Sequence, residues 1–155
     1  MKIILGLLPL VFFASCTKLG IFSPTRPAKS PEEVVKSFIE LSASAKEFTD
    51  KKKLEELCAG ELRRALERMT DEAFKISYIA NQIKIKEIKI LESTTQNDTA
   101  KIRYQIAVEN QSGTEPTDEI NEREVELTRS QGHWYIASIR IKGTDKIAFT
   151  RGMIF

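Results

Sequence analysis

The spacing of apolar residues changes near residue 82, and this change constrains the fold of the 155-residue chain more than any other feature. Before it, apolar residues recur at steps of three and four, as in Val34, Phe38, Leu41 and Ala45. This spacing predicts amphipathic helices. After it, apolar and polar residues alternate, most regularly in AKIRYQIAVEN (100–110), which predicts half-buried strands. Helices followed by a run of strands indicate an α+β fold.

Local signals set the expected ends of the helices. The stretch SPEE (30–33) reads as a capping box with Pro at the first helical position, so a helix is expected from residue 31. Asp50 is predicted to cap a second, short helix that ends at Gly60. A third helix is expected from about Glu61, with a break or kink at residues 70–71.

Four antiparallel strands are predicted to follow as a meander. The alternation slips at residues 86–87 and again between Ile136 and Ile139. Each slip indicates a β-bulge, which bends its strand. The stretch SQG (130–132) is typical of a tight hairpin connection. The predicted sheet is therefore curved rather than flat.

The charges of the strands are expected to lie on the solvent face of this sheet. Lys101 and Arg103 on the second strand can oppose Glu124 and Glu126 on the third. Such cross-strand pairs contribute about 0.2–1 kcal/mol each. A solvated sheet face therefore accounts for these charges better than a binding patch does. It also argues against a scaffold that dimerises through an apolar sheet face.

This order of elements resembles the nuclear transport factor two-like, or cystatin-like, superfamily. The resemblance lies in SPEEVVKSFIELSASA (30–45), DKKKLEELCAG (50–60) and GHWYIASIRI (132–141), and it covers about residues 30–142. It implies an α+β cone whose N-terminal helices pack in a curved, bulged four-stranded antiparallel sheet and can enclose a pocket. It implies no reaction, because the superfamily includes enzymes, binding modules and dimerisation domains.

The N-terminus carries an apolar run from residue 3 to residue 13 behind Lys2. This run is shorter than the about 20 residues of a membrane span and is typical of a signal peptide. The stretch FASC (13–16) then resembles the lipobox of bacterial lipoproteins, with Phe13 in place of the usual Leu. The resemblance implies cleavage before Cys16 and lipidation of its thiol. There are two alternatives. The segment is an ordinary signal peptide and Cys16 is incidental, or the signal stays uncleaved and serves as an anchor.

These features divide the chain into four parts. They are a lipoprotein signal peptide (1–15), a lipid-anchored linker (16–29), the cone domain (30–145) and an apolar C-terminal tail (146–155). The tail is expected to dock on the surface of the domain, or else to cover a dimer partner or an envelope protein. Thr17 stands where an Asp would favour inner-membrane retention, so the outer membrane is expected.

Composition excludes several classes of function. The 24 basic and 22 acidic residues nearly balance, which argues against a nucleic-acid partner. With Cys16 lipidated, Cys58 is the other of the two cysteines, so an internal disulfide is not expected. Cys58 lies on the apolar stripe of its helix with Leu54 and Leu57, so it is expected to be buried and unreactive.

Catalytic chemistry is not expected from the remaining residues. The single histidine, His133, stands at a strand start beside Gly132, where an exposed hairpin position suits it better than the role of a base. The aspartates fall at helix starts, in loops or in the tail: Asp50, Asp71, Asp98, Asp118 and Asp145. No metal-ligand spacing or Gly-rich phosphate loop is present, so neither a metal nor another cofactor is predicted.

The candidate ligand-binding residues are Tyr104, Arg123, Arg129 and Trp134. Tyr104 lies on the apolar face of its strand, and an arginine on such a face needs a partner, which an anionic ligand can provide. The plainer interpretation is that the aromatic residues are core and the arginines splay outwards. The sequence thus predicts a non-enzymatic binding or interaction module, held in membrane lipid through Cys16, whose partner is a small ligand or an envelope protein. A periplasmic small-molecule enzyme of the same fold is the alternative.

Overall fold

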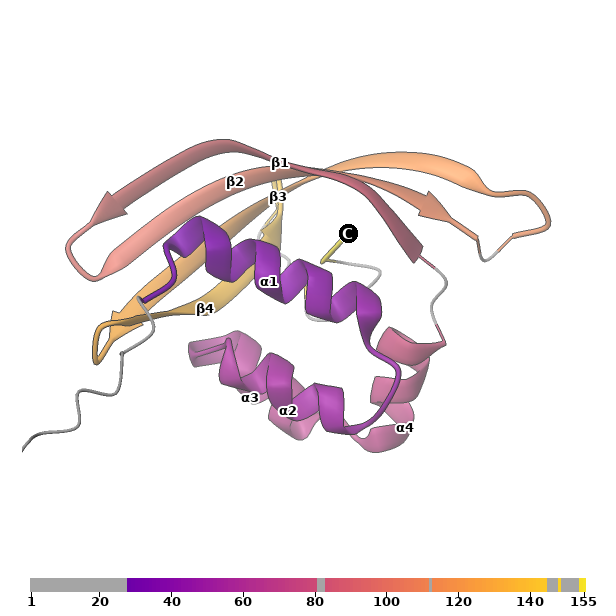
Figure 1. Ribbon diagram of the computed structural model, residues 1–155, viewed down its shortest axis with the longest axis horizontal. Helices are drawn as coiled ribbons and strands as arrows, with labels where there is room; N and C mark the ends of the chain where they lie inside the picture. The colour runs from indigo at the N-terminus through magenta and orange to yellow at the C-terminus, as the bar shows by residue number, and fades with distance from the viewer. Residues whose placement is uncertain (1–27, 81–82, 112, 145–147, 149–153) are drawn as a thin grey trace, which may run out of the picture.

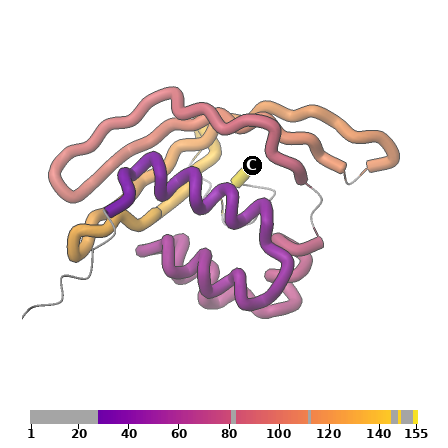
Figure 2. The backbone as a smooth tube through the Cα atoms, viewed as in Figure 1, coloured from indigo at the N-terminus to yellow at the C-terminus, as the bar shows by residue number. Residues whose placement is uncertain are grey.

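The computed structural model describes residues 28–80, 83–111, 113–144, 148 and 154–155. Its elements, shown in Figures 1 and 2, are α1 (Pro31–Ser44), α2 (Thr49–Glu56), α3 (Gly60–Arg68), α4 (Asp71–Phe74), a π-helical turn η1 (Lys75–Ile79), and the strands β1 (Ile83–Gln96), β2 (Thr99–Asn110), β3 (Thr117–Ser130) and β4 (His133–Ile141). The sheet arches over the helices, which lie on its concave side (Figure 1). The predicted α+β fold, with N-terminal helices packed in a curved sheet, is confirmed.

The four strands are antiparallel neighbours in the order β1-β2-β3-β4. The register shifts between Ile85 and Glu87 in β1, where a bulge was expected. In β4, Ile136 and Ser138 face consecutive residues of β3, so Ala137 is the extra residue of the second expected bulge. A further shift in β1, between residues 90 and 92, was not predicted. These irregularities bend the sheet around the helices.

The connection between β3 and β4 confirms the predicted tight hairpin. Gln131 and Gly132 both have positive φ, at 50° and 81°. A two-residue hairpin loop with positive φ at both positions matches the right-handed twist of its strands. Gly132 therefore supplies a backbone conformation that most side chains disfavour.

The core lies between the helices and the inner face of the sheet. α1 buries Val35, Phe38, Ile39 and, unexpectedly, Ser42. The predicted stripe instead included Leu41, which is only partly buried. The Ser42 hydroxyl has no hydrogen-bond partner among the described residues. The face of α1 that packs on the core is thus centred about one residue further along the chain than predicted.

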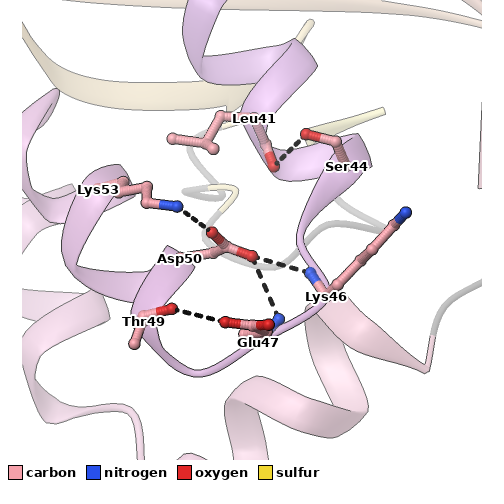
Figure 3. Close-up of polar contacts among 7 residues, drawn as sticks. All are labelled: Leu41, Ser44, Lys46, Glu47, Thr49, Asp50 and Lys53. Atoms are coloured by element: carbon pink, nitrogen blue, oxygen red, sulfur yellow. Dashed lines mark hydrogen bonds and ion pairs between the residues drawn. The ribbon is translucent and has the colours of Figure 1, made fainter.

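Asp50 closes the corner between α1 and α2, but it does not cap α2 (Figure 3). The N-cap residue is Phe48, which makes no side-chain cap. The Asp50 carboxylate instead accepts hydrogen bonds from the backbone N–H of Lys46 at 2.9 Å and of Glu47 at 3.2 Å. It also accepts one from the Lys53 ammonium at 2.7 Å. The predicted cap is wrong because this carboxylate reaches back to the preceding turn.

The second helix also ends earlier than predicted, at Glu56 rather than near Gly60. The residues that follow run beside the edge strand β4. The Ala59 N–H donates to the Ile136 carbonyl at 2.7 Å, and the Ile136 N–H donates to the Leu57 carbonyl at 2.9 Å. Cys58, between them, is fully buried as expected. This short pairing covers part of a sheet edge that would otherwise expose backbone donors and acceptors.

Candidate functional site

The candidate site lies in the cone interior, the space between the helices and the inner face of the sheet. Tyr104 of β2 and Arg123 of β3 are directly opposed in the register. Both side chains are directed inwards, because they alternate with the outward-facing residues of their strands. Tyr104 is fully buried and Arg123 is only 5% exposed. The structure therefore brings two of the predicted ligand-binding residues together and rules out an outward splay for Arg123.

Both side chains donate hydrogen bonds to the main chain of the C-terminal segment, the described residues Ala148, Ile154 and Phe155. The Tyr104 hydroxyl donates to the Ile154 carbonyl oxygen at 2.7 Å. The Arg123 Nη2 donates to the Phe155 main-chain oxygen, and its Nη1 donates to the Glu122 carbonyl oxygen at 3.0 Å. The main-chain oxygens of two consecutive residues are thus held by two neighbouring strands.

The C-terminal segment is part of the core. Ala148 and Ile154 are fully buried and Phe155 is 2% exposed. The Ala148 N–H donates to the Ile139 carbonyl of β4 at 2.7 Å. Figure 1 shows the C-terminal end inside the arch of the sheet. These three residues therefore pack against the chain's own domain, and more deeply than the surface docking expected for the tail.

Burial changes the titration of both donors. It raises the pKa of the Tyr104 phenol, an effect that the Arg123 guanidinium partly offsets. It lowers the pKa of Arg123, which the interaction with Tyr104 partly opposes. An arginine nevertheless stays charged in proteins. At neutral pH the pair thus presents a neutral hydroxyl donor and a cationic donor, a combination suited to carbonyl or carboxylate oxygens.

Arg129 and Trp134 lie apart from this pair, near the hairpin between β3 and β4. They oppose each other in the register, and the guanidinium of the exposed Arg129 sits 5.8 Å from the centre of the Trp134 ring. Trp134 also lines a small pocket of about 190 Å³, together with Lys29 and His133. The sequence grouped these two residues with Tyr104 and Arg123, but the structure does not bring the four together.

The outer face of the sheet carries a groove of about 340 Å³ lined largely by charged side chains. A row of alternating sign crosses all four strands at the paired positions Glu92, Arg103, Glu124 and Arg140. The guanidinium of Arg103 lies 3.1 Å from the Glu92 carboxylate. The expected opposition of Arg103 and Glu124 is confirmed by the register. Because neighbouring charges are matched, the groove offers no excess of one sign that would select an ion.

The remaining reactive residues lie outside the site. Cys58 is a buried free thiol, and desolvation raises its pKa. His133 is exposed at the start of β4. In the described part of the chain, no three His, Cys, Asp or Glu side chains cluster as metal ligands. Cys16, the expected lipidation site, lies outside the described residues.

Among the helices that the structure describes, none is long and apolar enough to cross a membrane.

Sequence comparison finds no match with a known protein family or a curated protein. The structure is similar to a SEC-C motif-containing protein from Rhodopseudomonas palustris, with a TM-score of 0.57 and 17% identity over 76% of this chain and 82% of that one. It is also similar to the intermembrane space region of the chloroplast protein ARC6, with a TM-score of 0.54 and 13% identity over 76% and 98%. An NTF2-like protein with a cystatin-like fold from Novosphingobium aromaticivorans matches with a TM-score of 0.46 and 14% identity over 73% and 80%. The first two likenesses show a shared fold.

Proposed function

We propose that this protein is a lipid-anchored lipoprotein of the bacterial cell envelope, and that its cone domain is a non-enzymatic binding or interaction module. The observation that carries the binding role is the pair of buried donors, Tyr104 and Arg123, both bonded to main-chain oxygens of the C-terminal segment. These donors hold main-chain oxygens at buried positions. A site of this kind holds a chain and has no need to transform it.

The anchor is supported by the lipobox-like stretch ending at Cys16 and by the length of chain that follows it. The first helix begins at Pro31, so 14 residues (16–29) separate the lipid from the domain. A chain of this length reaches at most about 50 Å when fully extended. Such a tether lets the domain reach partners near the membrane surface while it stays attached.

Intact-mass analysis with membrane fractionation tests the anchor in three versions of the full chain: wild type, Cys16→Ala and Cys58→Ala. Wild type and Cys58→Ala are expected at the membrane with the mass of a lipidated chain that starts at residue 16. Cys16→Ala is expected to be unlipidated and either unprocessed or released. Because Cys58 is the other cysteine, it controls for losing a thiol as such. Wild type that is cleaved, soluble and unlipidated would refute the anchor.

The same fractions test the expected outer-membrane location. After separation on a density gradient, the lipidated protein should follow outer-membrane markers, in keeping with Thr17. A Thr17→Asp variant is expected to move towards inner-membrane markers. Co-migration of wild type with the inner membrane would contradict the outer-membrane placement and leave the lipid anchor itself unaffected.

A further inference from the structure

We propose that the cone domain rests on the membrane surface with the end at which the tether joins it. This tether end consists of Lys29, Arg129, His133, Trp134 and Tyr135. Its partner is the headgroup region of a bilayer that contains anionic phospholipid. The contact rests on the lipid anchor proposed above and extends it, because it gives the anchored domain a preferred orientation.

Two distant parts of the chain meet at the tether end. Lys29 comes two residues before α1, at the point where the tether enters the domain. Lys29, Trp134 and Tyr135 line the same pocket of about 190 Å³, so the start of α1 lies against the first residues of β4. Figure 1 shows the indigo start of α1 beside the hairpin that joins β3 and β4. A domain held by lipid on Cys16 is therefore attached at this end.

The tether end carries two cations without acidic partners. Both Lys29 and Arg129 are exposed, and neither forms an ion pair with any described residue. The other basic residues of β2, β3 and β4 do have bonded partners: Lys101 with Glu126, Arg103 with Glu92, Arg140 with Glu61, and Arg123 with main-chain oxygens. Anionic headgroups attract such unmatched cations within a Debye length, about 10 Å at 0.1 M salt.

The aromatic residues of the tether end suit the boundary between lipid and water. The guanidinium of Arg129 lies 5.8 Å from the centre of the Trp134 ring. Trp134 is only 9% exposed, so it supports Arg129 from within the domain, whereas Tyr135 beside it is partly exposed. Tyr and Trp are enriched at membrane interfaces, because one end of the side chain is apolar and the other polar. Lysine and arginine likewise combine an apolar stem with a charged head.

The contact is weak by itself and becomes effective through the tether. Glu56 lines the same pocket, and the Asp98 carbonyl accepts a hydrogen bond from the Arg129 N–H at 2.8 Å, so two acidic residues lie near the two cations. A free domain would therefore gain little from a bilayer. An anchored domain is already close to it, and a group on a short flexible linker acts at an effective concentration of about millimolar. Without an attraction, the tether would let the domain turn freely.

Trp134 is the single tryptophan of the chain, so its fluorescence tests the contact without any substitution. The lipidated protein is reconstituted in vesicles of phosphatidylethanolamine and phosphatidylglycerol, with and without a phospholipid that carries a nitroxide quencher on its headgroup. The quencher is expected to lower the Trp134 fluorescence clearly, because the tether end lies among the headgroups.

A control protein moves the tryptophan away from the tether end. It combines Trp134→Phe with Ile120→Trp, since Ile120 is 69% exposed and lies about 30 Å along β3 from Ser130 at 3.3 Å per residue. Its fluorescence should be almost unaffected by the quencher. Equal quenching of the two proteins would overturn the inference, because the domain would then have no preferred orientation.

Paired substitutions test the two cations. Lys29→Gln with Arg129→Gln should reduce the quenching of Trp134 at least about twofold, because the headgroups lose both attractions. Lys89→Gln with Arg103→Gln removes the same charge from the outer face of the sheet, where these residues oppose Gln105 and Glu124, and should leave the quenching unchanged. Circular dichroism checks that all variants are folded. Equal quenching of the two pairs would overturn the inference.

Intact-mass analysis of the same preparations separates this contact from the anchor on which it depends. Protein that is lipidated and bound to the vesicles, but whose Trp134 is not quenched, refutes the contact and leaves the anchor intact. Unlipidated protein refutes the anchor, and the contact with it.

Discussion

Replacing Tyr104 by Phe removes one buried hydrogen bond and almost nothing else. The Tyr104 hydroxyl lies 2.7 Å from the Ile154 carbonyl oxygen, and both residues are fully buried. Phe fills nearly the same volume, so the change adds no sizeable cavity. It leaves the carbonyl without this donor, and an unsatisfied buried polar group costs about 1–3 kcal/mol. Because small domains have unfolding free energies of about 5–15 kcal/mol, this loss is readily measured.

Urea denaturation of the full chain provides the assay. With a denaturant slope of about 1–3 kcal/mol/M, the midpoint for Tyr104→Phe should fall by about 0.5–2 M at an unchanged slope. Tyr135→Phe is the matched control, since Tyr135 is only partly buried on β4, and it should change stability by less than about 0.5 kcal/mol. Unchanged stability of Tyr104→Phe would refute the reasoning, because the Ile154 carbonyl would then not depend on this hydroxyl.

A double-mutant cycle with Arg123→Gln extends the test. Tyr104 and Arg123 are opposed in the register and bond the main-chain oxygens of consecutive residues. Residues that belong to one hydrogen-bond network usually couple by about 0.5–3 kcal/mol. Once either donor is lost, the segment is held less firmly, so the second substitution should cost less than it does alone. Strictly additive losses would mean that the two donors act independently.

Three further predictions concern single polar residues of the core. Hydrogen bonds from Lys53 and then from the Lys46 and Glu47 backbones hold the pKa of Asp50 at about 2. Its unfolded value is about 3.9, so Asp50 stabilises the fold above pH 4, and this contribution is lost as the pH falls towards 2. Asp50→Asn should therefore lower the free energy of unfolding by about 1–2 kcal/mol at pH 7, after a discount for solvent screening. At pH 2 the loss should be much smaller, which denaturation at both pH values measures. An equal loss at the two pH values would contradict the assignment of this stabilisation to the Asp50 carboxylate. Ser42→Ala should leave the unfolding free energy unchanged or raise it by up to about 1 kcal/mol, because it removes a buried hydroxyl with no partner among the described residues. A clear fall in the thermal unfolding temperature would show that the hydroxyl does have a hydrogen-bond partner. The Cys58 thiol, whose pKa burial raises, should react with a thiol reagent only in denaturant, and fast labelling of the native protein would disprove its burial.

The alternation of apolar residues was enough to predict the sheet in detail. A period of two assigns each side chain to a face, so a slip in that period marks the position of a bulge. The slips at residues 86–87 and near Ala137 coincide with register shifts in β1 and β4. The shift between residues 90 and 92 escaped prediction, because both faces near the end of β1 are largely exposed. Where neither face of a strand is buried, apolar and polar residues need not alternate, so a bulge leaves no visible break in the pattern.

The interior site was predictable only in part, because its contacts connect distant parts of the chain. Tyr104 and Arg123 were singled out because each occupies an apolar face. Their partners in the C-terminal segment could not be identified, since 50 residues separate Tyr104 from Ile154 and no periodicity relates them. The apolar residues of the tail indicate that it is buried. They do not indicate which part of the domain it packs against. For Asp50 the difficulty was local, because a carboxylate near a helix start can bond forwards as a cap or backwards to the preceding turn.

The burial of Arg123 is a weak way to stabilise a fold, and this bears on the role of the site. Taking a guanidinium out of water costs several kcal/mol, and replacing buried charged groups with apolar residues of similar size is often neutral or stabilising. An apolar side chain at position 123 would pack against the C-terminal segment without needing its carbonyl. A guanidinium there makes stability depend on a suitably placed main-chain oxygen, which Phe155 supplies in this structure. The fold therefore depends on the position of the C-terminal residues more strongly than it would with an apolar residue at position 123.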